Sequence, residues 1–388
     1  MKEILNRNWK TKEGILNNLR KYIGAKGMCK VKYVLGQCVG ITSKRKKKIE
    51  LEKIIAESPF KKDDENWRSK YLKLINSTND EKYSETIKAF YLDNVKLIKK
   101  NITKNTDGVY IVCVEKNEIN RIKEFLKHYR KIGVKTFLIC DNGSMDGTLE
   151  YLKEQKDVCL YSTNEDYSSQ RKAAWCNRMM SDFGDQKWYF QVDADEFAWF
   201  PELDKIDINQ YVNNLAKKNI YAVKALMLEM YPNDILGGED ISVENFTEYY
   251  CYYDVDSDWY ERDVDQNYIR GGFINRIFGE KQALQCKTPL FYQTDKRFNL
   301  GSHHIYPYYE DITSKYGIIL KHYKFLPGDK QRVQNALEKK NYANGSRLYK
   351  KFVTIYDGNG INPFYEDSAK WDETNVLENL PFIEAVSE

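Results

Sequence analysis

The stretch Lys187-Trp-Tyr-Phe-Gln-Val-Asp-Ala-Asp-Glu-Phe197 joins a short apolar run to a group of carboxylates. Residues 188–192 predict a buried strand. Asp193, Asp195 and Glu196 follow at once, and carboxylates at the end of a buried strand need a cation or strong donors nearby. Ligands of an open α/β sheet bind just beyond the carboxyl ends of its strands. Asp193 and Asp195 are therefore candidate ligands of Mg²⁺ or Mn²⁺, with positions left for nucleotide phosphates. The alternative is an acidic turn that only caps the next element.

Strands alternate with helices in front of this stretch. Apolar runs predict strands at residues 109–114, 134–140, 158–161 and 188–192. Amphipathic spacing predicts helices between them, at residues 119–132, 148–156 and 173–183. This alternation predicts an α/β fold with a doubly wound, mainly parallel sheet.

The rest of the chain is less regular. The pattern predicts a helix at 208–215, strands at 221–231, 273–278 and 318–325, and amphipathic helices at 49–55 and 83–98. Residues 232–268 form a long acidic and aromatic segment, which is typical of a functional or mobile loop. We expect three parts: a basic, mostly helical region at 1–105, a nucleotide-binding α/β domain at 106–328 and a helical extension at 329–388.

Charge is distributed unevenly along the 388 residues. The net charge is +4 overall but +11 over residues 1–50, so the remainder carries −7. The basic segment is an anchor for anionic lipid, a nucleic-acid contact or only a solvated face. The chain has neither a run of about 20 apolar residues nor a signal-peptide pattern at its start. We therefore expect a cytoplasmic protein, either free or peripheral at the inner face of the membrane.

Two further strand ends carry polar residues. Glu118 follows the first predicted strand, and Asp141, Asn142 and Ser144 follow the second. The carboxyl ends of parallel strands share one edge of a sheet, so we expect these residues to lie near Asp193. The turn after Asp141 has acceptors for a base or a ribose hydroxyl. It also has residues that cap the following helix, and the two roles can coexist.

In this order, the motifs Glu-Lys-Asn-Glu118, Asp141-Asn-Gly-Ser-Met-Asp-Gly-Thr148 and Val192-Asp-Ala-Asp-Glu-Phe197 resemble glycosyltransferase family 2, which has the GT-A fold. The resemblance is greatest to the subgroup with Asp-x-Asp-Glu-Phe, which resembles bacterial surface-polysaccharide transferases. Later pieces add to it, among them Gly271-Gly-Phe-Ile-Asn-Arg276, Lys287-Thr-Pro-Leu290, His303-His304 and Leu320-Lys-His322. It covers roughly residues 107–330.

This resemblance implies a metal-dependent glycosyltransferase that moves a sugar from a UDP- or GDP-sugar to a glycan or glycolipid acceptor. Asp141 is implied to contact the base or ribose, Asp193 the ribose or the metal, and Asp195 and His322 the metal. His304 and Lys287 are candidate diphosphate or sugar contacts. Arg276 is expected in an apolar strand, where it needs an anionic partner, either a pyrophosphate or a structural carboxylate.

The family reaction inverts the anomeric carbon and needs a carboxylate that deprotonates the acceptor hydroxyl. Glu196, Glu239 and Asp240 are candidates, and the sequence does not choose among them.

Two other classes compete with this reading. A nucleotidyltransferase or other nucleotide-binding protein of similar fold is expected to carry a Gly-rich, basic phosphate loop after the first strand. Residues 114–118 contain no glycine, and no Gly-x-Gly-x-x-Gly follows that strand. A non-catalytic nucleic-acid-binding protein using the basic N-terminus leaves the carboxylates at the strand ends unexplained. We therefore expect no nucleic-acid partner.

Overall fold

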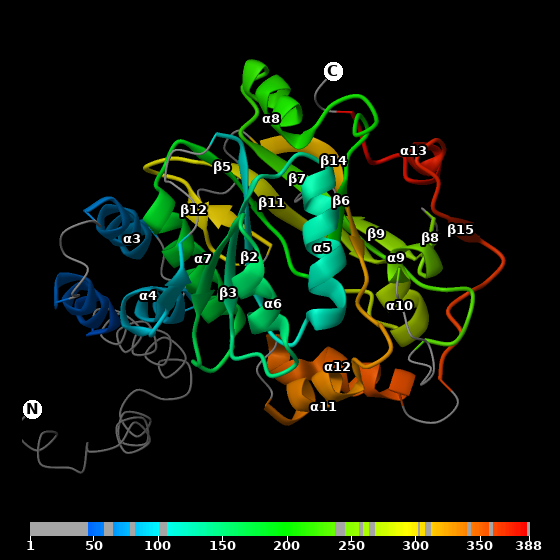
Figure 1. Ribbon diagram of the computed structural model, residues 1–388, viewed down its shortest axis with the longest axis horizontal. Coiled ribbons are helices and arrows are strands. Elements are labelled where there is room, and N and C mark those ends of the chain that lie inside the picture. The colour runs from blue at the N-terminus through cyan, green and yellow to red at the C-terminus, as the bar shows by residue number, and fades with distance from the viewer. Residues whose placement is uncertain are drawn as a thin grey trace, which may run out of the picture.

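The four strands expected between residues 109 and 192 lie side by side in the computed structural model (Figure 1). They are β2 (Val109–Glu115), β3 (Thr136–Asp141), β4 (Val158–Ser162) and β5 (Lys187–Gln191). All pair in parallel, in the order β4–β3–β2–β5. The structure describes residues 46–57, 65–77, 82–100, 107–236, 245–255, 259–263, 268–301, 303–306, 312–339, 343–356 and 360–385.

Within these ranges, nine strands form one sheet in the order β1–β4–β3–β2–β5–β11–β7–β14–β6. The five further strands are β1 (Lys96–Lys99), β6 (Glu196–Trp199), β7 (Ala222–Glu229), β11 (Cys286–Gln293) and β14 (Ile312–His322). β14 pairs with β7 in parallel, whereas β1, β11 and β6 run antiparallel to their neighbours. Six strands thus run one way and three the other, which confirms the expected α/β class with a mainly parallel sheet.

Helices cover both faces of the sheet, as β2 shows. Ile111 and Cys113 point into a core shared with α5 (Ile119–Lys131) and α8 (Ile208–Lys217). Tyr110 and Val112, on the opposite face, belong to a core shared with α7 (Ser169–Phe183). Because successive side chains of a strand alternate between faces, the strand is buried on both sides. This is the doubly wound arrangement that the sequence predicts.

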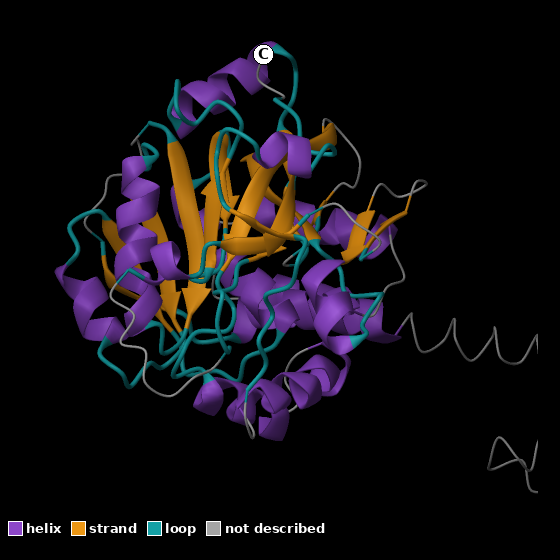
Figure 2. Cartoon of the chain, turned by 90° about the vertical axis from the view of Figure 1, so that its right-hand side faces the viewer, coloured by secondary structure: helices purple, strands orange, loops and turns teal. Residues whose placement is uncertain are grey.

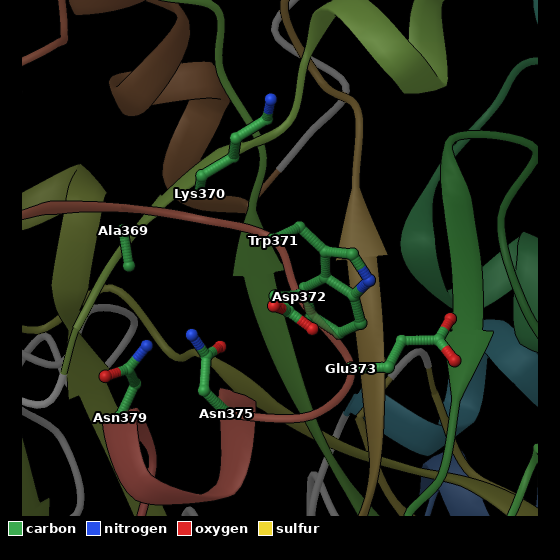
Figure 3. A pocket seen from close by; sticks show the side chains of 7 residues that line it. All are labelled: Ala369, Lys370, Trp371, Asp372, Glu373, Asn375 and Asn379. Atoms are coloured by element: carbon green, nitrogen blue, oxygen red, sulfur yellow. The ribbon is translucent and has the colours of Figure 1, made fainter.

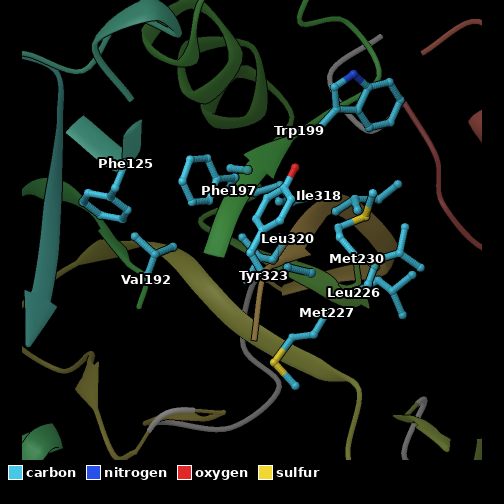
Figure 4. Packing of buried hydrophobic residues seen from close by; sticks show 14 of the residues in the cluster. Phe125, Val192, Phe197, Trp199, Leu226, Met227, Met230, Ile318, Leu320 and Tyr323 are labelled. Carbon is cyan, nitrogen blue, oxygen red and sulfur yellow. The ribbon is translucent and has the colours of Figure 1, made fainter. Parts of the chain in front are cut away.

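The first core reaches the acidic stretch through one aromatic side chain (Figure 4). The ring of Phe197 packs edge-on against Tyr323, with centroids 5.1 Å apart, and against Phe125 of α5, at 6.3 Å. Both contacts have the perpendicular geometry that aromatic pairs favour. Since Phe197 comes directly after Glu196, this packing fixes one side of the turn that carries the carboxylates.

The N-terminal helices pack on the other face, beside α7 (Figure 1). Residues 46–57 are helical and are followed by α3 (Glu65–Ser77) and α4 (Lys82–Leu92). Trp67 and Phe90 stack at 5.1 Å, and Tyr71 lies 5.5 Å from Phe298. The helix expected over 83–98 is wrong beyond Leu92, because residues 96–99 form β1, which pairs with β4 at the edge of the sheet.

The strand expected at 273–278 is also wrong, since this segment is the helix α10 (Gly272–Phe278). Gly271 and Gly272 have φ of 87° and 54°, and they turn the chain sharply before the helix. Gly279, at φ 65°, ends it in the left-handed conformation. The apolar residues therefore follow a helical spacing, with Ile274 and Phe278 both buried.

The remaining elements surround the sheet. They are α6 (Thr148–Glu154), α9 (Phe246–Tyr249), α11 (Lys330–Lys339), α12 (Ala343–Tyr356), α13 (Val376–Asn379), β8 (Tyr252–Asp254), β9 (Tyr260–Asp263), β10 (Tyr268–Gly271), β12 (Phe298–Asn299), β13 (Ile305–Tyr306) and β15 (Ser368–Lys370). None of the described helices combines the length and the apolarity needed to cross a membrane. The cysteines within the described ranges are free, and most of them are buried.

Candidate active site

Polar residues gather where the six same-direction strands end. In Figure 2 the arrowheads of neighbouring strands point to one end of the sheet, where loops converge. Glu115 ends β2, Asp141 ends β3, Glu229 ends β7 and His322 ends β14, while Asp193 follows β5 by two residues. The antiparallel β11 starts at this same end, so it contributes its second residue, Lys287.

A tight turn presents the two aspartates. The backbone N–H of Glu196 donates to the carbonyl of Asp193 at 3.0 Å, and the Glu196 carboxylate accepts the N–H of Asp193, also at 3.0 Å. Asp195 is held by its carbonyl, which accepts the N–H of Tyr323 at 2.8 Å. Residues of β6 and of the segment after β14 therefore hold the backbone of this turn. The turn carries the carboxylates of Asp193 and Asp195.

Two lysines bind the first carboxylate. Asp193 forms ion pairs with Lys172 of α7 and with Lys287, whose Nζ lies 3.4 Å away. Both lysine side chains are 5% exposed, whereas that of Asp193 is 29% exposed. Burial opposes ionisation of Asp193, but the two ammonium groups outweigh it and hold its pKa below the usual range.

The second carboxylate faces a histidine and an arginine. Asp195 Oδ2 lies 3.4 Å from Nε2 of His322 and 3.6 Å from Nη1 of Arg332. The other ring nitrogen of His322, Nδ1, lies 3.0 Å from the Glu229 carboxylate. Burial alone lowers the pKa of His322, but Glu229 and Asp195 outweigh it and raise this pKa to about 9. Burial works against Asp195 too, yet His322 and Arg332 keep its pKa well below the usual range.

Glu196 points inward. Its side chain is 1% exposed, and one of its oxygens is bound by Lys287 while the other accepts the Asp193 N–H. A carboxylate held in this way supports the turn and has no open path to a bound substrate.

Asp195, Glu196 and His322 form a group that fits a metal ion. One ligand atom from each lies within 4.8 Å of the others, and all three residues are buried. Carboxylate oxygens with an imidazole nitrogen suit divalent ions such as Mn²⁺. Glu229 behind His322 supplies the hydrogen bond that commonly orients a metal-bound histidine. Asp193 is not a member of this group, and its carboxylate is bound by the two lysines.

The turn after β3 is organised by its own aspartate. Asp141 is fully buried and accepts the N–H groups of Gly143 and Ser144 at 2.8 and 3.0 Å. The Asn142 amide donates to the Thr163 and Glu165 carbonyls at 3.2 and 2.9 Å. These contacts are the structural role of the turn, and base or ribose contact by Asp141 and Asn142 stays a prediction.

Ser144 links this turn to the end of β2. Its hydroxyl accepts the N–H of Asn117 at 2.9 Å and lies 3.4 Å from the Glu115 carboxylate. Glu115 sits opposite Asp141 in the register of β2 and β3. Burial raises the pKa of Glu115 well above its usual range, and the Asp141 carboxylate raises it further.

Glu118 belongs to a buried ion network. It accepts from Arg121 at 2.9 Å, and Arg332 lies 3.5 Å from its other oxygen. Arg121 also binds Asp329 at 3.0 Å and the carbonyl of Tyr323 at 3.1 Å. The network ties the start of α5 to the start of α11, which lies below α5 in Figure 1.

Two of the other residues singled out in the sequence, Arg276 and His304, have different neighbours. Arg276 lies on α10, where Asp254 binds it at 2.8 and 2.9 Å and the Tyr365 ring covers it at 4.0 Å. A structural carboxylate is therefore one partner of Arg276. His304 lies beside the Tyr268 ring, at 5.8 Å. Glu239 and Asp240 lie outside the described residues.

Four residues of this site were not expected from the sequence: Lys172, Glu229, Arg332 and Arg121. Lys172 lies on the buried stripe of α7, four residues before Cys176 and seven before Met179, so its helical spacing could have marked it. Glu229 is the last residue of an apolar strand, and the same pattern identified Asp141 as a candidate in the sequence. Arg121 and Arg332 each pair with a carboxylate three residues earlier, Glu118 and Asp329, but their contacts with the rest of the site are distant in sequence.

A surface cavity of about 690 Å³ lies elsewhere (Figure 3). It is lined by a single segment, residues 369–379, in which Trp371 is the aromatic member. The Trp371 ring packs on Trp199, at the far end of β6 from Glu196. The cavity contains none of the carboxylates or cations described for the sheet edge.

No family model matches the chain, and no curated protein does. Among solved structures, it is similar to TarS residues 1–349 from S. aureus, with 9% identity, a TM-score of 0.27 and coverage of 64% of this chain and 70% of that one. It is also similar to HddC from Yersinia pseudotuberculosis, with 11% identity, a TM-score of 0.26 and coverage of 55% and 89%. Likeness of this degree assigns no activity, so a functional assignment depends on the residues at the sheet edge.

Proposed function

We propose that the protein is a metal-dependent glycosyltransferase that moves a sugar from a nucleotide-sugar donor to a glycan acceptor with inversion. The observation that carries the proposal is the group formed by Asp195, Glu196 and His322 at the end of the same-direction strands. Ligands of open α/β sheets bind at this edge. The motif resemblance supplies the reaction class, with surface polysaccharide or lipopolysaccharide assembly as its setting.

We assign the metal site to Asp195 and His322, with Glu196 as the third member of the group. Mn²⁺ or Mg²⁺ is the proposed ion. A divalent ion there offsets the negative charge that develops on a nucleoside diphosphate leaving group. Glu229 orients the imidazole of His322 and fixes which nitrogen faces the site.

Asp193 has a different proposed task. Its carboxylate is partly exposed and is held in position by Lys172 and Lys287. A fixed, ionised carboxylate is suited to accept a hydrogen bond from a ribose hydroxyl. In this proposal Lys172 positions Asp193, and Lys287 neutralises both Asp193 and Glu196.

The acceptor hydroxyl needs a base. Glu196 is buried, and both of its oxygens are engaged within the protein, so it does not suit this role. Glu239 and Asp240 remain the proposed candidates. The donor is proposed to be a UDP- or GDP-sugar, and the basic segment 1–50 is proposed to contact an anionic membrane surface that presents the acceptor.

Calorimetric titration with UDP and with GDP, each with and without Mn²⁺, tests the proposal. We expect micromolar binding of one nucleotide that requires Mn²⁺ and is lost in Asp195→Ala. Asp157→Ala is the matched control. This carboxylate pairs with Arg130 and lies just before β4, at the opposite end of the parallel strands from Asp195. Binding that is absent under every condition, or that is equal in Asp195→Ala and the wild type, contradicts the proposal.

A further inference from the structure

Arg332 is the most exposed of the four basic side chains that contact the Asp-x-Asp carboxylates. Its side chain is 27% exposed, against 5% for Lys172 and for Lys287 and 7% for His322. It enters the site from α11, which follows β14 and the metal-site histidine. Of these four side chains, therefore, Arg332 is the most accessible to a bound molecule.

The contacts of Arg332 with the site are long. Nη1 lies 3.6 Å from Asp195 Oδ2 and 3.5 Å from Glu118 Oε1, at or beyond the limit of a hydrogen bond. Nε is buried and has no hydrogen-bond partner within the described residues. Only Nη2 is firmly held, by the Lys324 carbonyl at 2.7 Å and Asp329 at 3.2 Å.

Arg121 shows what a structural arginine in the same network looks like. It is 3% exposed, and its Nε and Nη1 donate to oxygens at 2.9–3.1 Å. Its binding capacity is satisfied by Glu118, Asp329 and two backbone carbonyls. Arg332 lies against the same carboxylates but leaves part of its donor capacity unused.

We propose that Arg332 binds the diphosphate of the nucleotide-sugar and stabilises it as the leaving group, an inference that rests on the proposed function. A guanidinium forms paired hydrogen bonds with phosphate oxygens, which a lysine cannot match. In the reaction, the bond between the anomeric carbon and the diphosphate oxygen breaks, and its electron pair stays on that oxygen. The acceptor oxygen bonds to the anomeric carbon and loses its proton to the base.

The fold allows Arg332 to exchange partners with little movement. Asp329 is held by Arg121 and by the Leu326 N–H at 2.9 Å, so the start of α11 stays fixed. The long contacts to Asp195 and Glu118 are the ones that phosphate oxygens replace. The carboxylate of Asp195 is then released for the metal ion that the proposed function places there.

The test compares ligands that differ only in phosphate. Uridine, UMP and UDP, and the guanosine series, are titrated by calorimetry at fixed Mn²⁺ into the wild type, Arg332→Gln, Arg332→Lys and Arg347→Gln. Arg347 is the matched control because it lies in the same helical pair, on α12, and binds Glu280 at 2.6 Å. Thermal unfolding of each variant verifies that it is folded.

We expect Arg332→Gln to weaken diphosphate binding about 10- to 100-fold, to leave nucleoside binding within about twofold, and to be partly rescued in Arg332→Lys. Unchanged diphosphate affinity in Arg332→Gln overturns the inference. So does an equal loss for nucleoside and diphosphate, or an equal loss in Arg347→Gln, since either marks a structural role. If the wild type binds no nucleotide, the proposed function itself is overturned. If the wild type binds UDP or GDP and Arg332→Gln gives one of these contrary results, only the role of Arg332 is overturned.

Discussion

Asp193 and Asp195 are separated by a single residue, yet their carboxylates are held by different charges from different parts of the chain. Asp193 is bound by Lys172 and Lys287, and Asp195 faces His322 and Arg332. Asp193 is thus neutralised by two ammonium groups that keep their charge. Asp195 faces the imidazole of His322, which can lose its proton, so the Asp195 carboxylate is available to a metal ion.

This difference predicts unequal costs for the two amide substitutions. Asp193→Asn leaves two buried ammonium groups with only Glu196 to balance them, so we expect the free energy of unfolding to fall by about 3 kcal/mol. Asp195→Asn costs less, because His322 can become neutral and Arg332 is partly in water. Urea denaturation of both variants without metal at neutral pH measures the difference. Equal losses contradict the division of roles between the two aspartates.

Glu229→Gln tests the support of the metal site. Glu229 touches only the far nitrogen of His322, so the three proposed ligand atoms remain. We expect Mn²⁺ affinity to fall about 10- to 100-fold, as is common when the partner of a metal-bound histidine is removed. Titration with Mn²⁺ alone gives the measurement. Glu280→Gln is the control, a buried carboxylate paired with Arg347 and Lys351; if both variants bind Mn²⁺ like the wild type, Glu229 does not support a metal site.

The lowered pKa of His128 predicts that the free energy of unfolding decreases in mild acid. Its Nε2 lies 2.9 Å from the Ala198 carbonyl, and burial, aided by Lys321, lowers its pKa to about 3. The unfolded chain takes up a proton near pH 6.5 that the folded protein does not. The free energy of unfolding therefore decreases as pH falls from about 6.5 towards 3, by at most about 1.4 kcal/mol per pH unit.

The variant His128→Gln keeps an N–H for the Ala198 carbonyl but does not titrate. Urea denaturation at pH 7 and pH 5 should give a smaller loss of stability for this variant than for the wild type. His303 also has a pKa lowered to about 3 by burial, with Lys287 adding to the effect, so part of the acid sensitivity will remain. A variant that loses as much stability as the wild type assigns the effect to other groups.

Trp67→Ala tests whether the N-terminal helices belong to the core of the protein. Trp67 is 3% exposed and contacts Tyr71, Phe90 and Phe298, the last of which lies beyond the central strands in sequence. We expect a loss of about 3 kcal/mol in the free energy of unfolding, in a single transition. Trp259→Ala, at a residue that is 36% exposed, is the control and should cost far less. A separate early transition, with the main one unchanged, would show that these helices fold independently.

The parallel half of the sheet could be predicted from the sequence because its signals are local. Residues 109–114 and 188–192 are continuous apolar runs, as strands buried on both faces require. Each run ends in polar residues, and the shared direction of the strands brings those ends together. Asp141 and Asp195 were found in this way, although their roles remain predictions.

The other half depends on contacts that no local pattern encodes. β11 inserts between β5 and β7, although residues 286–293 include Pro289, and the pairing with β7 shifts register between Lys287 and Leu290. Proline in a central strand argues against a strand when only the sequence is considered. Lys287 reaches Asp193 because β11 takes this place in the sheet, and for that reason the sequence marked Lys287 as a candidate but did not predict its ion pair with Asp193.

The order of the charged residues along the sequence also bears on synthesis of the chain. A nascent chain that ends after β6 already contains the four parallel strands and both aspartates, but of their four partners it holds only Lys172. Lys287, His322 and Arg332 leave the ribosome later, in the last third of the sequence. Domains fold progressively during translation, so the acidic turn emerges before most of its charge partners. In a chain interrupted after β6, Asp193 has one of its two lysine partners and Asp195 has neither His322 nor Arg332.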